Sequence, residues 1–321
     1  MIFEKKVIDL YKKTLLKRHD PTGAVFYFGK DDFPGLCFDE LSFKGNKGQR
    51  LIGGFYYRGA KRSDKIVVFD HGMGCGHAAY MQEINLLTEN GYTVFSYDHT
   101  GTGSSDGEHI GGFSQSLADL DQAMTALKAM PELADTKFAV IGHSWGGYST
   151  MNIPAFHPEI THVVALAGFI SPKAIQKQFL RGALSLYRKV IFKIEKNALP
   201  DYCERDARQS LKKTDAKALI IHSVDDDTVS FKAHFDALRK EFRESERVSF
   251  LTVADKRHHP HYTKSAVLCE DEFKREYKRR LKSSLLTSDK EKSEFRDSYD
   301  WVKMTEQDGD LWREIISFLN S

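Results

Sequence analysis

Short, nearly continuous apolar runs recur along the chain and alternate with amphipathic helical patterns. The runs are KIVVFDHG, YTVFSYD, KFAVIGHS, THVVALAG, ALIIHSV and VSFLTVAD. Patterns such as AAYMQEINLLTENG and SQSLADLDQAMTALKAMP separate several of them. Strands that are apolar on both faces, alternating with helices that have one apolar face, are typical of a parallel sheet covered by helices on both sides. The sequence therefore predicts an α/β fold.

Two earlier segments and two long insertions complete the predicted architecture. CFDELSF and RLIGGFYYRG, joined by the turn KGNKGQ, indicate an antiparallel meander at one edge and bring the expected sheet to eight strands. Residues 169–213, the first insertion, separate two strands by far more than one crossover helix requires. Residues 264 to about 305, the second insertion, are mostly charged with a helical pattern. We expect residues 1–168 and 214–321 to form the core and residues 169–213 to form a helical cap.

The composition and the N-terminal residues indicate where the protein is located and which kinds of partner it binds. With 47 basic and 45 acidic residues the net charge is +2, which makes no case for binding nucleic acid or a membrane surface. The chain has no run of 18 apolar residues, so we expect no transmembrane segment. Four scattered cysteines and a start without signal-peptide features indicate a cytoplasmic protein with reduced thiols. The start instead predicts a helix lying on the domain, with one apolar face made of Ile2, Phe3, Val7, Leu10, Tyr11 and Leu15.

The segment KFAVIGHSWGGYST places Ser144 in the pattern G-x-S-x-G, directly after a predicted strand and before a helical pattern. A strand-to-helix turn of this kind is so sharp that the serine backbone is strained and its hydroxyl projects outward. Side chains two residues on either side would collide, which explains Gly142 and Gly146. A serine hydroxyl is a poor nucleophile without a base and without donors for the oxyanion that develops. The rest of the sequence must supply these groups.

Glycines after another strand suggest where the oxyanion donors lie. The segment FDHGMGCGH lets the backbone turn so that an amide can point into the site, and we expect the N–H groups of Met73 and Trp145 to be the donors. A nucleotide-binding loop is excluded by spacing. The pattern G-x-G-x-x-G would need glycine where His77 stands, and GTGSSDG fails in the same way at Asp106.

The acid and the base follow two later strands. In ALIIHSVDDDTVS we predict Asp226 as the acid, with Asp225 as the nearest alternative. In ADKRHHPHYT we predict His258 as the base, with His259 and His261 as alternatives. These histidines could also suggest zinc, but no nearby cysteine or HExxH pattern supports a metal site. We therefore expect neither a metal nor a cofactor.

The order Ser144, Asp226, His258, each at the carboxyl end of a predicted strand, is the order known from α/β hydrolases. The chain resembles that superfamily over nearly its whole length, through HGMG, YDHTGTGSS, GHSWGG, HSVDDDTV and KRHHPHYT. It is most similar to the bacterial esterase, lipase and acyl-hydrolase branch. The resemblance implies Ser144 as nucleophile, His258 as base, Asp226 as orienting acid, and Met73 and Trp145 as oxyanion donors. Thr100 stands where relatives often have arginine, which concerns the anchoring of that loop.

The first insertion has an apolar stripe and a basic face. Between Lys173 and Lys196 there are seven basic residues and one acidic residue, Glu195. We interpret the stripe mainly as an ordinary face packed on the core, with a cap over the pocket as the functional alternative. The stripe consists of Phe179, Leu180, Ala183, Leu184, Tyr187, Val190, Ile191 and Ile194.

The second insertion contains EDEFKREYKRRLKSSLL, with Phe273, Tyr277 and Leu281 four residues apart. We expect a covering helix here.

The sequence thus predicts a serine hydrolase that cleaves a small-molecule ester through an acyl-enzyme. Thioesterase, amidase and peptidase activities use the same apparatus and stay open. A non-catalytic binding protein on the same fold is a further alternative. It is disfavoured because every part of the site has a candidate residue.

Overall fold

The computed structural model describes residues 11, 13, 16–19, 24–62, 64 and 66–321. Of the predicted N-terminal helix, Tyr11 is described and is buried, whereas Ile2, Phe3, Val7, Leu10 and Leu15 lie outside the described residues.

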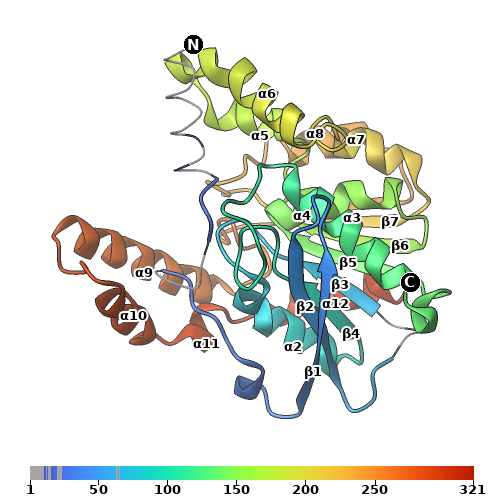
Figure 1. Cartoon of the computed structure of the whole chain (residues 1–321), viewed down its shortest axis with the longest axis horizontal. Helices are drawn as coiled ribbons and strands as arrows, with labels where there is room; N and C mark the ends of the chain where they lie inside the picture. The colour runs from blue at the N-terminus through green and yellow to red at the C-terminus, as the bar shows by residue number, and fades with distance from the viewer. Residues whose placement is uncertain (1–10, 12, 14–15, 20–23, 63, 65) are drawn as a thin grey trace.

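The described strands form one sheet in the middle of the molecule (Figure 1). Its eight strands lie in the order β1-β2-β4-β3-β5-β6-β7-β8, which confirms the predicted count and fold class. Strand β2 is antiparallel to both β1 and β4, and all other neighbours are parallel. The strands are β1 (Leu36–Lys44), β2 (Arg50–Arg58), β3 (Ile66–Asp70), β4 (Thr93–Tyr97), β5 (Phe138–His143), β6 (Ile160–Leu166), β7 (Lys217–Ser223) and β8 (Val248–Val253).

Helices cover both faces of the sheet, as the alternation of patterns predicts. Apolar residues of α3, α4 and α8 pack with one set of strand residues, and those of α2 and α12 pack with the alternate set. Along β3, for example, Val68 faces the first group, while Val67 and Phe69 face the second. The α-helices are α2 (Met81–Glu89), α3 (Gln115–Lys128), α4 (Trp145–Asn152), α5 (Pro172–Phe179), α6 (Arg188–Ala198), α7 (Ala207–Ser210), α8 (Phe235–Glu241), α9 (Lys264–Lys282), α10 (Asp289–Asp297), α11 (Trp301–Met304) and α12 (Gly309–Leu319).

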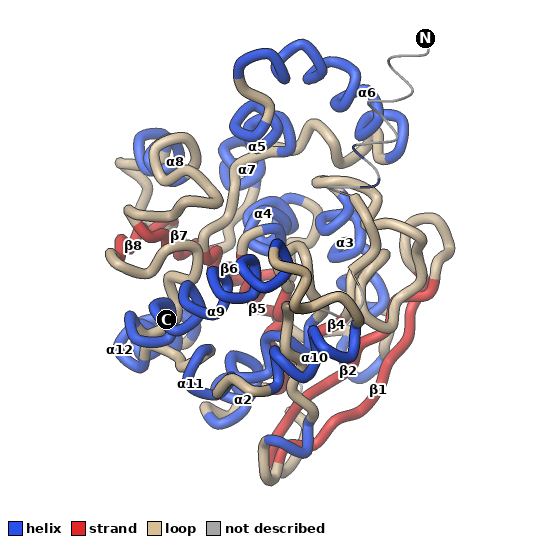
Figure 2. The backbone as a smooth tube through the Cα atoms, turned by 90° about the vertical axis from the view of Figure 1, so that its left-hand side faces the viewer, coloured by secondary structure: helices blue, strands red, loops and turns tan. Residues whose placement is uncertain are grey.

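The two insertions form separate groups of helices. Helices α5 and α6 of the first insertion lie together, and α9, α10 and α11 of the second lie elsewhere (Figures 1 and 2). The second group has its own small core, in which Phe273 and Phe295 stack with ring centroids 5.9 Å apart. Phe273 is buried, Tyr277 is half-buried and Leu281 is exposed, so of the three predicted apolar positions only the one in the middle of α9 is fully buried.

The apolar stripe of the first insertion divides between the core and the surface. Ile191 is buried, and Leu180, Tyr187 and Ile194 pack against the main core. By contrast, Leu184 is 53% exposed. The interpretation of this stripe as a core-facing surface therefore describes only part of it.

Glu195 attaches the first insertion to the core, although it is the sole acidic residue of a basic segment. Its carboxylate accepts hydrogen bonds from the backbone N–H of Phe113 at 2.7 Å and from the Ser114 hydroxyl at 2.8 Å. The Ser114 N–H also donates to it, at 3.2 Å. These donors lie at the start of α3, where backbone N–H groups have no partner within the helix. Burial raises the pKa of Glu195 against the effect of these donors.

None of the helices in the described part of the chain is both long enough and apolar enough to cross a bilayer.

We predict that Glu195→Ala destabilises the fold, because it leaves the Phe113 and Ser114 donors buried without an acceptor. Such unsatisfied groups cost about 1–3 kcal/mol each, so urea unfolding should show a loss of about 2 kcal/mol or more in unfolding free energy. Lys193→Ala, on the exposed side of the same helix, is the matched control and should change stability by less than about 0.5 kcal/mol. Equal unfolding midpoints for the two variants would contradict this role of Glu195.

Candidate active site

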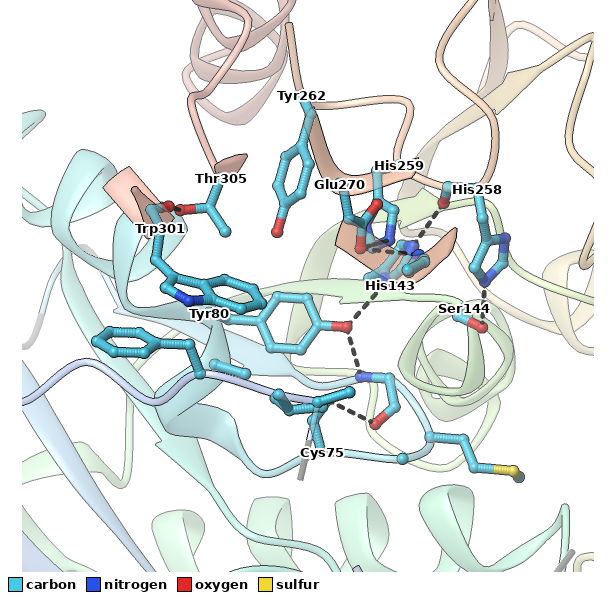
Figure 3. Close-up of a pocket in the computed structure, with 18 of the residues that line it drawn as sticks. Cys75, Tyr80, His143, Ser144, His258, His259, Tyr262, Glu270, Trp301 and Thr305 are labelled. Carbon is cyan, nitrogen blue, oxygen red and sulfur yellow. Dashed lines mark hydrogen bonds and ion pairs between the residues drawn. The ribbon is translucent and has the colours of Figure 1, made fainter. Parts of the chain in front are cut away.

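The structure brings Ser144, His258 and Asp226 together at the carboxyl ends of the parallel strands. Ser144 follows β5, Asp226 lies beyond β7 and His258 lies beyond β8. The Ser144 hydroxyl donates to His258 Nε2 at 2.8 Å (Figure 3). His258 Nδ1 in turn donates to Asp226 Oδ2 at 2.8 Å. This orientation of the protons follows from the carboxylate, which can only accept.

The turn at Ser144 has the strained conformation that the motif predicts. Ser144 has φ 56° and ψ −106°, a conformation that L residues rarely adopt. A Cβ atom at Gly142 would lie 2.3 Å from the carbonyl oxygen of Gly146, and one at Gly146 would lie 2.0 Å from that of Asp70. Both glycines are therefore required by the close approach of backbone segments at this turn.

Four donors surround the Asp226 carboxylate. Oδ1 accepts from the backbone N–H groups of Thr228 and Val229, each at 2.8 Å. Oδ2 is shared by His258 and by His222, whose buried Nε2 lies 3.0 Å away. Burial opposes ionisation of Asp226, but the hydrogen bonds from His222 and His258 outweigh it and hold the pKa of this carboxyl below its usual range. Asp226 is thus a fixed anion beside the His258 imidazole.

His258 is held as a neutral imidazole at near-neutral pH. Burial lowers its pKa, and the Asp226 carboxylate only partly offsets this effect. A neutral ring with Nδ1 protonated leaves Nε2 free to accept the proton of Ser144.

The residues predicted as alternatives for the acid and the base bind other groups. Asp225 accepts from the Ser223 hydroxyl at 2.5 Å. His259 Nε2 lies 3.3 Å from the Glu270 carboxylate, and His261 Nε2 lies 3.0 Å from that of Glu83. Of the residues considered, it is therefore His258 and Asp226 that the geometry connects to Ser144.

An ion pair made by a buried lysine supports the loop that carries His258. Lys256 lies 2.7 Å from Asp308, the N-cap residue of α12, and also donates to the carbonyl oxygen of Tyr262. The neighbouring residues Asp255 and Arg257 have positive φ values of 60° and 49°. The loop is thus tightly turned and tied to the C-terminal helix.

A chain of buried hydrogen bonds joins three loops of the site (Figure 3). Gly72 N–H donates to the Tyr80 hydroxyl at 3.1 Å, and that hydroxyl donates to His143 Nδ1 at 2.8 Å. His143 Nε2 donates to the carbonyl oxygen of His258 at 2.8 Å. Burial, with the neighbouring histidines, lowers the pKa of His143, so it stays neutral and keeps one donor and one acceptor. These bonds therefore fix the positions of the HGMG loop, the serine turn and the loop that carries His258 relative to one another.

Trp145 and Met73, the predicted oxyanion donors, are close to Ser144 in different ways: Trp145 follows it in the chain, and Met73 lines the same cavities. Trp145 is the first residue of α4, where the backbone N–H has no partner within the helix. Its indole is fully buried and donates to the carbonyl oxygen of Phe113 at 2.7 Å, so the indole N–H is already satisfied. Met73 lines both cavities described next, together with Ser144.

Two cavities meet at Ser144 and share Met73, Gly74 and His258 as lining residues. The first cavity, of about 290 Å³, lies under the second insertion. Its outer lining includes Phe26, His259, Tyr262, Glu270, Phe273, Lys274, Trp301 and Thr305. The second cavity, of about 330 Å³, lies under α5. Its lining includes Phe113, Phe169, Ile175, Phe179 and Val229. Both insertions therefore shape the space around the serine.

The loop after β4 is anchored despite the missing arginine. Thr100 donates to Asp119 of α3 through its backbone N–H and its hydroxyl, both at 2.8 Å. Arg18, from the N-terminal segment, donates to the carbonyl oxygens of Gly103, Ser105 and Gly107. A guanidinium from elsewhere in the chain thus holds this loop.

Within the described part of the chain, no group of three or more His, Cys, Asp or Glu side chains is arranged to hold a metal ion. Although His258, His259 and His261 are close in sequence, they pair with three different carboxylates.

Sequence reasoning missed four residues of this site. His143 and His222 are polar side chains at the ends of apolar strand runs, and that exception to the pattern could have singled them out. Tyr80 and Glu270 gave no such signal, because their contacts depend on how α2 and α9 pack.

Comparison with known proteins identifies the family. The model of the serine aminopeptidase S33 family matches residues 61–259, more than half of the chain. The chain belongs to this family of α/β hydrolases. The resemblance drawn from the sequence motifs is thereby confirmed.

Curated relatives match this S33-family chain over a limited segment. A protein named putative carbamate hydrolase RutD from Caulobacter segnis is 32% identical over 109 residues, which cover 34% of this chain. A putative non-heme haloperoxidase of Mycobacterium phage D29 is 28% identical over 130 residues, covering 40% of this chain. The match spans 39% of the length of the first relative and 44% of the second.

Solved structures match the fold of the S33-family chain more broadly. An esterase of Pyrococcus furiosus aligns with a TM-score of 0.58 and 20% identity, over 84% of this chain and 97% of its own. Acetyl xylan esterase 1 of Thermoanaerobacterium aligns with a TM-score of 0.52 and 16% identity, over 86% and 92% of the two chains.

We predict that the His258 imidazole titrates below pH 6.5, because burial disfavours its charged form. Histidine NMR, with the resonance assigned by its loss in His258→Gln, measures the midpoint. Asp226→Asn should lower the midpoint further, since the carboxylate favours the imidazolium. A wild-type midpoint above 6.5, or a rise in the Asp226→Asn variant, would contradict this account of the site.

Proposed function

We propose that this protein is a serine hydrolase that cleaves a carboxylic ester through an acyl-enzyme at Ser144. The observation that supports this most is the continuous chain of hydrogen bonds from the Ser144 hydroxyl through His258 to Asp226, with 2.8 Å at each step. A serine in a strained turn, in contact with a neutral imidazole that a buried anion orients, has the requirements of an activated nucleophile.

In the first half of the reaction, Ser144 Oγ attacks the carbonyl carbon of the ester. His258 Nε2 accepts the hydroxyl proton as the new C–O bond forms, and the carbonyl oxygen takes the negative charge. The N–H groups of Met73 and Trp145 stabilise this oxyanion, and each such donor typically contributes about 10²- to 10³-fold in rate. His258 then gives its proton to the leaving alcohol as the original ester bond breaks.

In the second half, water hydrolyses the acyl-enzyme by the same route. His258 Nε2 takes a proton from water, and the hydroxide attacks the acyl carbon. The proton returns to Ser144 Oγ as the acid leaves. Asp226 stabilises the imidazolium at both stages without accepting its proton.

Amide or peptide hydrolysis is the second candidate, because the family to which the chain belongs is described as serine aminopeptidases. The same nucleophile and base could also hydrolyse thioesters and carbamates. A non-catalytic binding role is disfavoured, because the hydrogen-bonded arrangement would serve no purpose in it.

We also propose that residues 169–213 act as a cap over the site. Ile175 and Phe179 of α5 support this role, because they line the cavity that reaches Ser144. A cytoplasmic location remains a prediction from the scattered cysteines, which are all unpaired.

We predict that Ser144→Ala lowers kcat for p-nitrophenyl butyrate by at least about 10³-fold, and that Asp226→Asn lowers it by up to about 10⁴-fold. Initial rates should be accompanied by labelling with a fluorophosphonate probe, which forms its bond with an activated serine.

Wild-type protein and Ser317→Ala, a serine variant on the exposed side of α12, should both be labelled and active, whereas Ser144→Ala should be neither. Undiminished turnover by folded Ser144→Ala would reject the proposal. A parallel assay with aminoacyl p-nitroanilides measures the second candidate activity.

A further inference from the structure

The two cavities at Ser144 differ in chemistry, and the difference bears on the substrate. The carbonyl carbon of a bound ester must lie beside Ser144, His258 and Met73, which both cavities share. Its acyl chain and its alcohol must then extend in different directions. The two parts of the substrate therefore occupy different cavities.

The reaction itself indicates which cavity takes which part. The acyl group stays bound through both halves of the reaction, whereas the alcohol leaves first and water must take its place. A cavity with polar lining admits that water more readily than an apolar one. The charged side chains of Glu270 and Lys274 line the cavity under the second insertion. The other cavity is lined mainly by apolar side chains such as Phe113, and its own polar residues among those that the structure describes, His19 and Thr228, include no Lys, Asp or Glu. The alcohol accordingly belongs under α9 and α11, and the acyl chain under α5.

The size of the apolar cavity limits the acyl chain. This cavity, of about 330 Å³, is many times larger than the space that one water molecule needs, so it can take an acyl chain of several carbon atoms. Phe179 closes one side of this cavity and is itself 45% exposed. An acyl chain of medium length fills the space.

The charges in the alcohol cavity are balanced. Glu270 is the sole acidic side chain among the described residues that line either cavity. Its carboxylate lies 2.8 Å from the Lys274 ammonium and 3.3 Å from His259 Nε2. Burial opposes its ionisation, but His259 and Lys274 outweigh this and hold the pKa of Glu270 below its usual range. The anion is thus already paired and does not attract a second cation.

The pairing of Glu270 with Lys274 is unfavourable for binding a substrate that has a free, positively charged amino terminus. An aminopeptidase must bind an α-ammonium next to the scissile bond, and a buried cation needs an anionic partner. The aromatic side chains Phe26 and Trp301, which stack with centroids 5.5 Å apart, instead offer a flat apolar wall beside polar groups. An uncharged alcohol that carries polar groups matches this lining.

We propose that the substrate is an ester of a medium-length apolar acid with an uncharged polar alcohol, bound with its acyl chain under α5 and its alcohol under the second insertion. This inference rests on the proposed ester hydrolysis at Ser144. It makes Lys274 a specificity-determining residue, because its ammonium masks the charge of Glu270.

The first test removes the Lys274 ammonium that pairs with the Glu270 carboxylate. Butyrylcholine and 3,3-dimethylbutyl butyrate differ in having nitrogen or carbon at the centre of the trimethyl group, so their kcat/KM ratio measures selectivity for a cationic alcohol. The wild type should prefer the neutral ester. Lys274→Met should raise the cationic-to-neutral ratio by about tenfold or more, because the Glu270 carboxylate loses the nearer of its two partners and keeps only His259. Lys278→Met, one turn further along α9 and outside the cavity lining, should leave the ratio unchanged.

The second test changes the cavities separately. Phe179→Ala should move the optimum of a p-nitrophenyl acyl series to longer chains and leave the order of preference among butyrates of different alcohols unchanged. Ala24→Phe, which fills the first cavity, should lower kcat/KM for butyrates of bulky alcohols at least fivefold relative to methyl butyrate and leave the acyl optimum unchanged. Both positions are incompletely buried, so the variants should fold.

Failure of this inference is separable from failure of the proposed function. A wild-type preference for butyrylcholine, an unmoved ratio in Lys274→Met, or an exchange of the two effects in Phe179→Ala and Ala24→Phe would overturn the assignment of the cavities. In each of these cases, the proposed ester hydrolysis would still be supported if the activity were lost in Ser144→Ala. Loss of that dependence on Ser144 would instead reject the mechanism from which the inference starts.

Discussion

The close approach of the serine turn to strand β3 is the constraint on which the site depends. A Cβ atom at position 146 would lie 2.0 Å from the carbonyl oxygen of Asp70, so only glycine allows α4 to begin there. That contact forces Ser144 into a positive φ of 56°. The strain is maintained because buried residues of β5 and α4 on either side pack into the core and prevent the turn from relaxing. The packing of the core thus holds Ser144, the proposed nucleophile, in this conformation.

Around this turn, buried polar groups hold loops that are far apart in sequence. Tyr80 and His143 connect the HGMG loop to the backbone of His258, while Lys256 and Asp308 tie the base loop to α12. Tyr80, His143 and Lys256 are buried, so the loss of a partner would leave each of them without compensation. The position of His258 is therefore determined by several elements of the fold together. This arrangement suits the role proposed for His258, because a general base must stay within hydrogen-bond distance of the Ser144 hydroxyl, here 2.8 Å.

Each of the two insertions lines one of the two cavities beside Ser144. Glu195 attaches the first insertion to the start of α3, and Phe273 and Phe295 give the second insertion a small core of its own. Because each insertion is anchored independently, we expect a substitution in one cavity to leave the other cavity and the contact of Ser144 with His258 unchanged. Function on this fold resides in the site and its lining and does not follow from the sheet alone.

The sequence by itself determined the sheet, the order of its strands along the chain and the turn at Ser144, because apolar alternation and glycine spacing are local properties of neighbouring residues. The sequence favoured His258 but left His259 and His261 open, since three histidines in one short loop look alike until their partners Asp226, Glu270 and Glu83 are placed by the tertiary structure. The same holds for the cavity under α9, which sequence patterns described only as a covering helix. Its lining comes from segments as distant as Phe26 and Trp301, and contacts over such separations arise from the packing of whole elements, which no local pattern encodes.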